Sequence, residues 1–232
     1  MIYVTGDLHG EIEVAQKYAD KVGAGDTLII AGDFGAPWYF PDHPNHERFD
    51  KPLLKLLASC DFTVAFVDGN HENYTLLSQY PMEIRWGGRV QNVDGVYHLL
   101  RGERYTMDDG TTIFTFGGAT SVDKAHRSEG ISWWPQEVCS DEDVDRAYRT
   151  LERCNWTVDY VITHTAPVQF ADLYHGIDYR KDEIRCKTAD FLSILNEKLT
   201  YRKWYFGHFH HDVNTAALRA RLLFNDIVSL GG

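Results

Sequence analysis

The chain has 232 residues, of which 44% are hydrophobic and 25% are charged. This length and composition can bury the core of one sizeable domain, which we expect to span residues 1–232. The formal net charge of −11 repels phosphate backbones and argues against general nucleic-acid binding, although a phosphorylated small substrate is compatible with cations gathered at one site.

The four cysteines predict a reducing environment, because no two of them have the CxxC spacing of a thiolate zinc site or suggest a disulfide framework. They are Cys60, Cys139, Cys154 and Cys186. No apolar run approaches the roughly 20 residues that cross a bilayer. The first residues, MIYVTGD, lack the basic start of a signal peptide. We therefore expect a cytoplasmic protein that does not contact membranes.

The first seventy residues alternate strand and helix patterns. Apolar runs predict strands at 2–4, 27–31 and 62–67, with helices over 11–22 and 46–58. Pro52 opposes a straight second helix. Continuous apolar strands separated by helices are typical of a parallel sheet covered on both faces. Polar residues follow each of these strands, and such strand ends are where α/β proteins place their sites.

The middle of the chain has a different pattern. Short β-type segments at 96–100, 104–107 and 112–116, with the turn signal Asp109-Gly110, predict antiparallel strands and a second sheet. The glycine-rich polar loop that follows, Gly117–Glu137, is long for a connection within a compact domain, which indicates a functional or mobile segment.

The last third returns to alternating helices and strands. Ser140 and Asp143 resemble a capping pair at the start of a helix that ends near Cys154. A strand at 160–163 and another at 204–206 are separated by a helix over 188–199. His164 follows the first of these strands, and the sequence GHFHH follows the second.

Residues that bind metals well follow five predicted strand ends. Each has an ordinary explanation on its own, as a helix cap, a turn residue or a buried histidine. Together, carboxylates and imidazoles at five ends indicate a site for Mn, Fe or Zn, and seven ligands fit two ions if one carboxylate bridges them. The residues are Asp7 and His9, Asp33, Asn70 and His71, His164, and His208 and His210.

The ordered motifs GDLHG (6–10), GD (32–33), GNHE (69–72), THTAP around His164 and GHFH (207–210) cover nearly the whole chain. This set resembles the calcineurin-like metallophosphoesterase superfamily. The resemblance implies an α/β (α+β) fold, a four-layer αββα sandwich of two mixed β-sheets flanked by helices. It also implies a centre of two divalent metal ions, for which we expect manganese by residue type, with iron or zinc as alternatives.

The resemblance implies a role for each residue of the motifs. Ligands of one metal would be Asp7, His9 and His210. Ligands of the second would be Asn70, His164 and His208, with Asp33 bridging both. His211 is a rival to His210. His71, next to a ligand, would protonate the leaving group, and Asp68 or Glu72 could supply an acidic partner for it.

The second motif departs from that of the related protein Ser/Thr phosphatases. Those enzymes read GDxVDRG, and their arginine contacts phosphate, whereas this chain reads GDFGAPW over 32–38. We therefore expect the substrate phosphate to contact Lys124 or Arg127 in the long loop, with Trp133 or Trp134 forming a pocket wall. The alternative is a loop with solvated charges and buried tryptophans.

Other aromatic and histidine residues have weaker signals. Trp38, Tyr39 and Phe40 either line the entrance to the site or pack in the core. The histidines outside the motifs are expected to be structural or at the surface. They are His43, His46, His98, His126 and His175. For His126 alone, a functional role in the Gly117–Glu137 loop is also considered.

These patterns predict a metal-dependent phosphoesterase that cleaves phosphate mono- or diesters by in-line attack of a metal-bridged hydroxide, with His71 as proton donor. Its substrate would be a phosphorylated small molecule or a nucleotide-like compound. Three alternatives stay open: a non-catalytic binding module on the same scaffold, a protein Ser/Thr phosphatase, and a mononuclear hydrolase of other esters.

Overall fold

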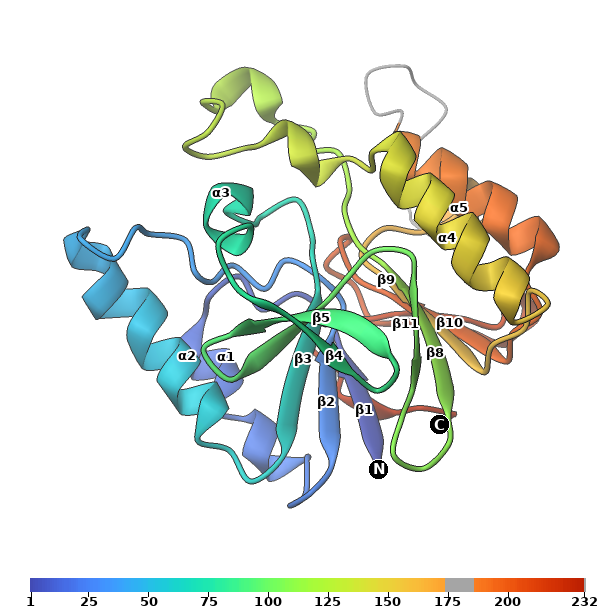
Figure 1. Ribbon diagram of the computed structural model, residues 1–232, viewed down its shortest axis with the longest axis horizontal. Coiled ribbons are helices and arrows are strands. Elements are labelled where there is room, and N and C mark those ends of the chain that lie inside the picture. Colours follow the sequence, from blue (N-terminus) through green and yellow to red (C-terminus); the bar gives the residue numbers. More distant parts are fainter. Residues whose placement is uncertain (174–185, 232) are drawn as a thin grey trace.

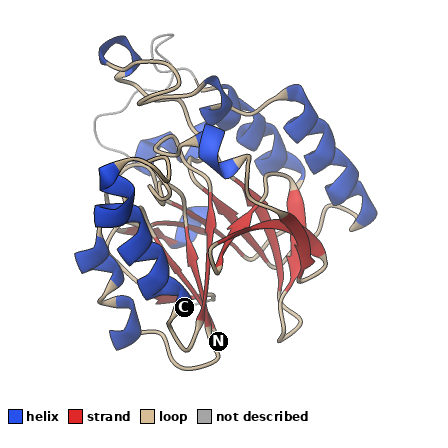
Figure 2. Cartoon of the chain, turned by 60° about the vertical axis from the view of Figure 1, so that its left-hand side comes forward, coloured by secondary structure: helices blue, strands red, loops and turns tan. Residues whose placement is uncertain are grey.

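Two β-sheets stack face to face between two layers of helices in the computed structural model, which describes residues 1–173 and 186–231 (Figure 1). Figure 2 shows the strands in the middle of the molecule with helices on both outer sides. The four-layer αββα sandwich expected from the sequence is therefore confirmed, and both of its sheets are mixed.

The first sheet has seven strands within the described residues, in the order β13-β1-β2-β3-β6-β5-β4. Its centre, from β1 to β6, is parallel, and both edges are antiparallel. The strands are β1 (Ile2–Thr5), β2 (Thr27–Ile30), β3 (Thr63–Val67), β4 (Met82–Arg85), β5 (Gly88–Val93), β6 (Val96–Leu99) and β13 (Val228–Ser229).

The second sheet has six strands in the described part of the chain, in the order β11-β12-β10-β9-β8-β7. Its four central strands are parallel, and the outer two are antiparallel to their neighbours. The strands are β7 (Glu103–Thr106), β8 (Thr112–Phe116), β9 (Tyr160–Thr163), β10 (Lys203–Phe206), β11 (Val213–Thr215) and β12 (Ala220–Leu222).

Three clusters of buried apolar side chains fill the spaces between the four layers. One lies between α2 and the first sheet, a second joins the two sheets through residues such as Ile29 and Ile162, and a third packs α4 and α5 on the second sheet. The helices are α1 (Ile12–Ala15), α2 (Lys51–Ala58), α3 (Tyr74–Leu77), α4 (Asp141–Arg153) and α5 (Lys187–Lys198). Shorter helical turns are Tyr18–Asp20, His46–Asp50, Lys124–His126, Pro135–Glu137, Val168–Leu173 and Ala216–Leu218.

Several helix predictions hold, with changes at their ends. Ser140 and Asp143 form the predicted capping box, since each side chain accepts a hydrogen bond from the other's backbone N–H at 2.9–3.1 Å. Pro52 lies in the first turn of α2, directly after the helical turn His46–Asp50. The helix predicted over 11–22 is wrong in length, because it breaks into α1 and the turn Tyr18–Asp20.

The strand pairing also differs from the sequence prediction. The segment predicted over 96–100 does not belong to the second sheet but pairs in parallel with β3 as β6. The predicted hairpin at Asp109-Gly110 is confirmed and joins β7 to β8. Strands β4 and β5 and the short strands β11 to β13 were not predicted. In β4 every residue is exposed or half-buried, so it carries no alternating apolar pattern.

The carboxyl ends of the parallel strands of both sheets lie at one end of the molecule, uppermost in Figure 1, opposite the two termini. The Gly117–Glu137 loop crosses above this end. Within the described residues, none of the helices combines the length and the apolar character that a bilayer span requires.

Candidate metal centre

The two sheets approach so closely at this end that the motif glycines have no room for a side chain. A Cβ at Gly32 (φ +96°), after β2, would lie 2.1 Å from the ring of His164, which follows β9. A Cβ at Gly207, after β10, would lie 2.1 Å from Asp7 Oδ1, which follows β1. At Gly32 and Gly207 the missing side chain therefore lets a side chain of the opposite sheet reach the site.

Four predicted ligands form one group. The side-chain atoms of Asp7, His9, Asp33 and His210 lie within 4.8 Å of one another. The Nε2 atoms of His9 and His210 are 3.0 Å apart, and His210 Nε2 is 3.2 Å from Asp7 Oδ2. Nitrogen ligands lie about 2.0–2.1 Å from a divalent ion such as zinc, which places two ligands of one ion about 3 Å apart. The residues therefore fit a cation. His210 and not its neighbour His211 belongs to this group.

A second group shares Asp33 with the first. It contains Asp33, His164 and His208, again within 4.8 Å. His164 Nε2 lies 3.2 Å from Asp33 Oδ1 and 3.1 Å from Asn70 Oδ1. The other ring nitrogen, His164 Nδ1, donates to the carbonyl of Ala31 at 2.9 Å, which leaves Nε2 free to face a metal.

The electrostatics of this group centre on the pair formed by Asp33 and His164. Burial disfavours the charged form of Asp33, yet the charge and hydrogen bond of His164 outweigh it and hold the pKa of the carboxyl well below its usual range. Burial would lower the pKa of His164, but Asp33 raises it to about 10. Burial, with the charge of His164, lowers the pKa of His208 to about 3. A bound cation would replace the proton on His164, so we expect metal binding to release protons.

Four of these residues have left-handed backbone conformations, which are uncommon outside glycine. The φ angles are +50° at His9, +45° at Asp33, +72° at His208 and +52° at His210. Such conformations cost on the order of 1–2 kcal/mol each and gather at functional sites. Here they turn the side chains of successive loop residues toward one point.

His71 lies at the edge of this cluster. Its ring is 5.0 Å from that of His9, and its backbone N–H donates to Asp33 Oδ1 at 2.8 Å. Arg127 of the overhanging loop donates to His71 Nε2 at 3.0 Å. Burial lowers the pKa of His71; Asp33 opposes that effect, and Arg127 adds to it. In this arrangement Nε2 accepts a hydrogen bond, so it does not carry a proton.

Lys124, the other predicted phosphate contact, has a different partner. Its Nζ lies 2.6 Å from the fully buried carboxylate of Glu137 and 4.7 Å from the centre of the Trp133 ring. Trp134 is buried and donates to Thr75 Oγ1 at 2.9 Å, so it anchors the loop on α3. Of the two cations, Arg127 is thus the one that contacts a site residue.

Sequence reasoning missed two residues that orient Asn70. The Asn70 side-chain amide donates to Ser121 Oγ at 3.1 Å, and Ser121 Oγ donates to Glu137 Oε2 at 2.8 Å. The chain of bonds points the amide oxygen of Asn70 toward His164. Neither Ser121 nor Glu137 belongs to a motif. Ser121 lies 51 positions from Asn70 in the sequence, so no local pattern could identify their contact.

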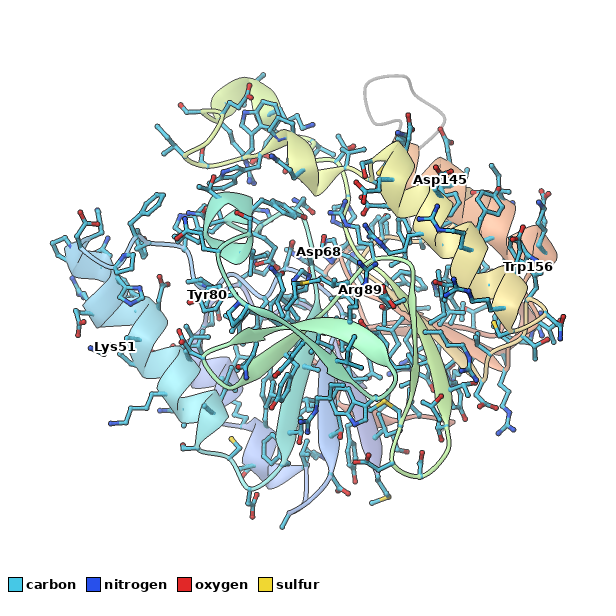
Figure 3. All side chains as sticks on the ribbon, viewed as in Figure 1. Lys51, Asp68, Tyr80, Arg89, Asp145 and Trp156 are labelled. Atoms are coloured by element: carbon cyan, nitrogen blue, oxygen red, sulfur yellow. The ribbon has the colours of Figure 1, made fainter. Side chains whose placement is uncertain are left out.

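The two acidic candidates for a partner of His71 have other contacts. Glu72 accepts hydrogen bonds from the backbone N–H groups of Phe34, Gly35 and Gly69 at 2.7–3.3 Å, and thus ties the second motif to the third. Burial raises the pKa of Glu72 well above its usual range. Asp68, which is labelled in Figure 3, is buried and pairs with Arg101 and with His98 Nε2.

The other histidines lie outside the cluster. His98 is buried against Asp68, His46 Nδ1 lies 3.3 Å from Asp50, His43 stacks on Tyr39, and His126 is exposed. His175 lies outside the described residues. A pocket of about 340 Å³ adjoins His9 and His71 and is lined by Trp38 and Tyr39 but not by Phe40.

The chain has counterparts among known proteins. The family model of calcineurin-like phosphoesterases matches residues 1–212. The chain belongs to this family. The family resemblance drawn from the motifs is thus confirmed, and membership supports a phosphoester hydrolase that uses divalent metals.

Among solved structures, two distant likenesses of this chain illustrate its fold. One is a Staphylococcus aureus protein assigned as a 5'-nucleotidase, in complex with alpha-ketoglutarate, at 15% identity and a TM-score of 0.52. The match covers 96% of this chain but 48% of that one, so this chain spans about half the length of that relative. Another is the phosphopantetheinyl hydrolase of Mycobacterium tuberculosis, at 18% identity and a TM-score of 0.49, covering 96% and 87% of the two chains. At such identities the likeness concerns the fold. A comparison with curated proteins found no match.

Proposed function

We propose that this protein is a phosphoesterase with a dinuclear metal centre that hydrolyses small phosphate mono- or diesters. The observation that carries the proposal is Asp33, whose carboxylate belongs to both groups of ligand atoms. A shared carboxylate is what two neighbouring ions require, whereas one mononuclear site has no use for seven ligands.

The ligand types indicate which ions the centre would hold. Asp7, His9 and His210 would bind one ion and Asn70, His164 and His208 the other, with Asp33 between them. Imidazole and carboxylate donors suit manganese, iron or zinc, and we propose manganese as the most effective. When bound, such a pair supplies a hydroxide nucleophile near neutral pH and neutralises charge on the phosphate.

The chain itself would supply the proton for the leaving group. His71 is next to Asn70 but belongs to neither ligand group, and its position near His9 suits protonation of the leaving oxygen. Arg127 must first leave His71 Nε2, because a guanidinium can only donate hydrogen bonds. A phosphate group offers Arg127 a better, charged acceptor, so substrate binding would free His71 for this role.

A small substrate suits this site better than a phosphoprotein. Phe34 and Gly35 follow Asp33 where the protein Ser/Thr phosphatases have the GDxVDRG pattern with its arginine. All seven proposed ligand positions carry residues that can bind a metal, which disfavours a non-catalytic binding module. The four cysteines are free thiols, which supports a reducing compartment such as the cytoplasm.

The test is metal-dependent hydrolysis by the purified, metal-stripped protein. We expect turnover of 4-nitrophenyl phosphate or bis(4-nitrophenyl) phosphate on addition of Mn²⁺, and about two equivalents of metal by elemental analysis. One equivalent with full activity would favour the mononuclear alternative. Two equivalents with no hydrolysis of any ester tried would favour a binding module.

A further inference from the structure

We propose that the pocket beside His71 binds a flat, uncharged ring of the alcohol part of the substrate, such as an aryl group or a nucleobase. This inference rests on the proposed function and specifies its substrate class. It identifies Phe49, with Trp38 and Tyr39, as residues that select the leaving group.

The position of the pocket assigns it to the leaving group. Its lining includes His9, which belongs to the ligand cluster, and His71, the proposed proton donor. A phosphate held by the cluster would have its leaving oxygen near His71, because the acid must be within hydrogen-bond reach of the atom that it protonates. Whatever is attached to that oxygen then extends into the adjoining space. The volume of about 340 Å³ is within the usual range for small-molecule sites.

The remaining lining is aromatic and held in place. Trp38, Tyr39 and Phe49 are among the residues that line the pocket, and Gly10 and Gly35 contribute no side chains that would fill it. The buried carboxylate of Asp50 accepts the backbone N–H groups of Trp38 and Tyr39 at 3.0 and 2.7 Å, which fixes both residues. Aromatic walls of this kind favour a flat ring, because ring pairs contribute beyond the apolar area that they bury.

The charge of the pocket excludes another class of leaving group. No lysine or arginine is among the described residues that line it, and its one acidic side chain is Asp50. Arg48 lies 5.0 Å from the centre of the Phe49 ring and Arg127 donates to His71, but neither lines the pocket. A second phosphate, as in a dinucleoside polyphosphate, or an acidic peptide would meet no cation among the lining residues. A neutral ring fits the aromatic lining of the pocket and needs no cation within it.

Phe49 gives the sharpest test, because the same segment offers a matched control. Phe49 and Phe40 are both 45% exposed, but only Phe49 lines the pocket. The experiment compares kcat/KM of the Mn²⁺-loaded protein for phenyl phosphate and for methyl phosphate. We expect Phe49→Ala to lower the phenyl-to-methyl ratio about tenfold, because the phenyl ring of the ester then packs against one aromatic wall fewer. Phe40→Ala should leave the ratio unchanged, and Phe49→Tyr should restore most of it.

An unchanged ratio in Phe49→Ala, with the wild type active on both esters, would overturn the pocket assignment and leave the proposed function intact. If the wild type hydrolyses neither ester, binding decides the pocket, and the proposed function fails only if 4-nitrophenyl phosphate and bis(4-nitrophenyl) phosphate are not hydrolysed either. Calorimetry with benzylphosphonate and methylphosphonate should then show at least a tenfold preference for the benzyl compound in the wild type, and no such preference in Phe49→Ala. Equal affinities of the wild type for both compounds would overturn the assignment.

Discussion

The strand-end ligands and the Gly117–Glu137 loop meet at one site but are held in different ways. Asp33 and His164 are buried, follow central strands of the two sheets and hydrogen-bond backbone groups of neighbouring motifs. In the loop, Arg127 is held by Asp123, by a carbonyl and by His71 itself. The ligands therefore have one geometry that the sheets impose, whereas Arg127 has several partners that it can exchange.

This difference assigns the two parts of the chemistry to different regions of the molecule. Cation binding needs fixed distances, which the converging strands provide. Contact with an arriving substrate needs a residue that can change partners, and loops carried on a rigid scaffold provide such residues. Substitutions in the two regions should consequently fail in different ways.

The largest effect is expected at the shared carboxylate. Asp33→Asn keeps the shape of the side chain but removes the charge that the two proposed ions would share, so kcat/KM for 4-nitrophenyl phosphate should fall more than about 10³-fold. Elemental analysis should show that at least one metal is lost. A variant that keeps two metals and most of its activity would refute the dinuclear arrangement.

His71 is expected to affect chemistry without affecting metal content. His71→Gln should lower kcat about 10²–10³-fold for an alkyl phosphate, whose leaving group needs a proton. The loss should be much smaller for 4-nitrophenyl phosphate, whose leaving group departs as a stable anion. Equal losses for both substrates would show that His71 acts in another way.

Ser121 joins the two regions, since it is a loop residue that orients a ligand. Ser121→Ala removes the hydrogen bond to the Asn70 amide, and such changes behind a ligand cost about 10–100-fold in metal affinity or activity. Titration of the stripped protein with Mn²⁺ measures the loss. Ser128→Ala, at an exposed serine of the same loop, is the matched control and should bind Mn²⁺ as the wild type does.

The smallest effects should separate the two cations of the loop. Arg127→Ala should lower kcat/KM about tenfold and change the melting temperature little, because Arg127 contacts the site. Lys124→Ala should do the reverse and cost about 1–2 kcal/mol of stability, because the buried carboxylate of Glu137 loses its cation and keeps only the hydrogen bonds from Ser121. Kinetics and thermal melts of both variants check this, and a kinetic defect confined to Lys124→Ala would reverse their roles.

The sequence allowed the buried parts of the molecule to be predicted better than its edges. Strands such as β2, TLII, are wholly buried and show an uninterrupted apolar run. The edge strand β4, MEIR, has no such pattern, and β13 has only two residues, so pairing with a neighbour defines both.

For the site, motif order was enough to collect the ligand candidates, because each motif places its residue directly after a central strand. The partners of Lys124 and Arg127 could not be predicted in the same way. Both are cations on one polar loop, and only the position of Glu137 next to Lys124 and of His71 next to Arg127 distinguishes them. The role of Ser121 likewise depends on a contact between distant segments.

The left-handed backbone at His9, Asp33, His208 and His210 has a consequence for how long the protein survives in a cell. Strain at these four positions lowers the stability of the cation-free protein. Cations that bind only the folded state raise that stability again by mass action. Depletion of divalent ions should therefore increase turnover of the protein by proteases, so that its abundance follows the supply of its cofactor.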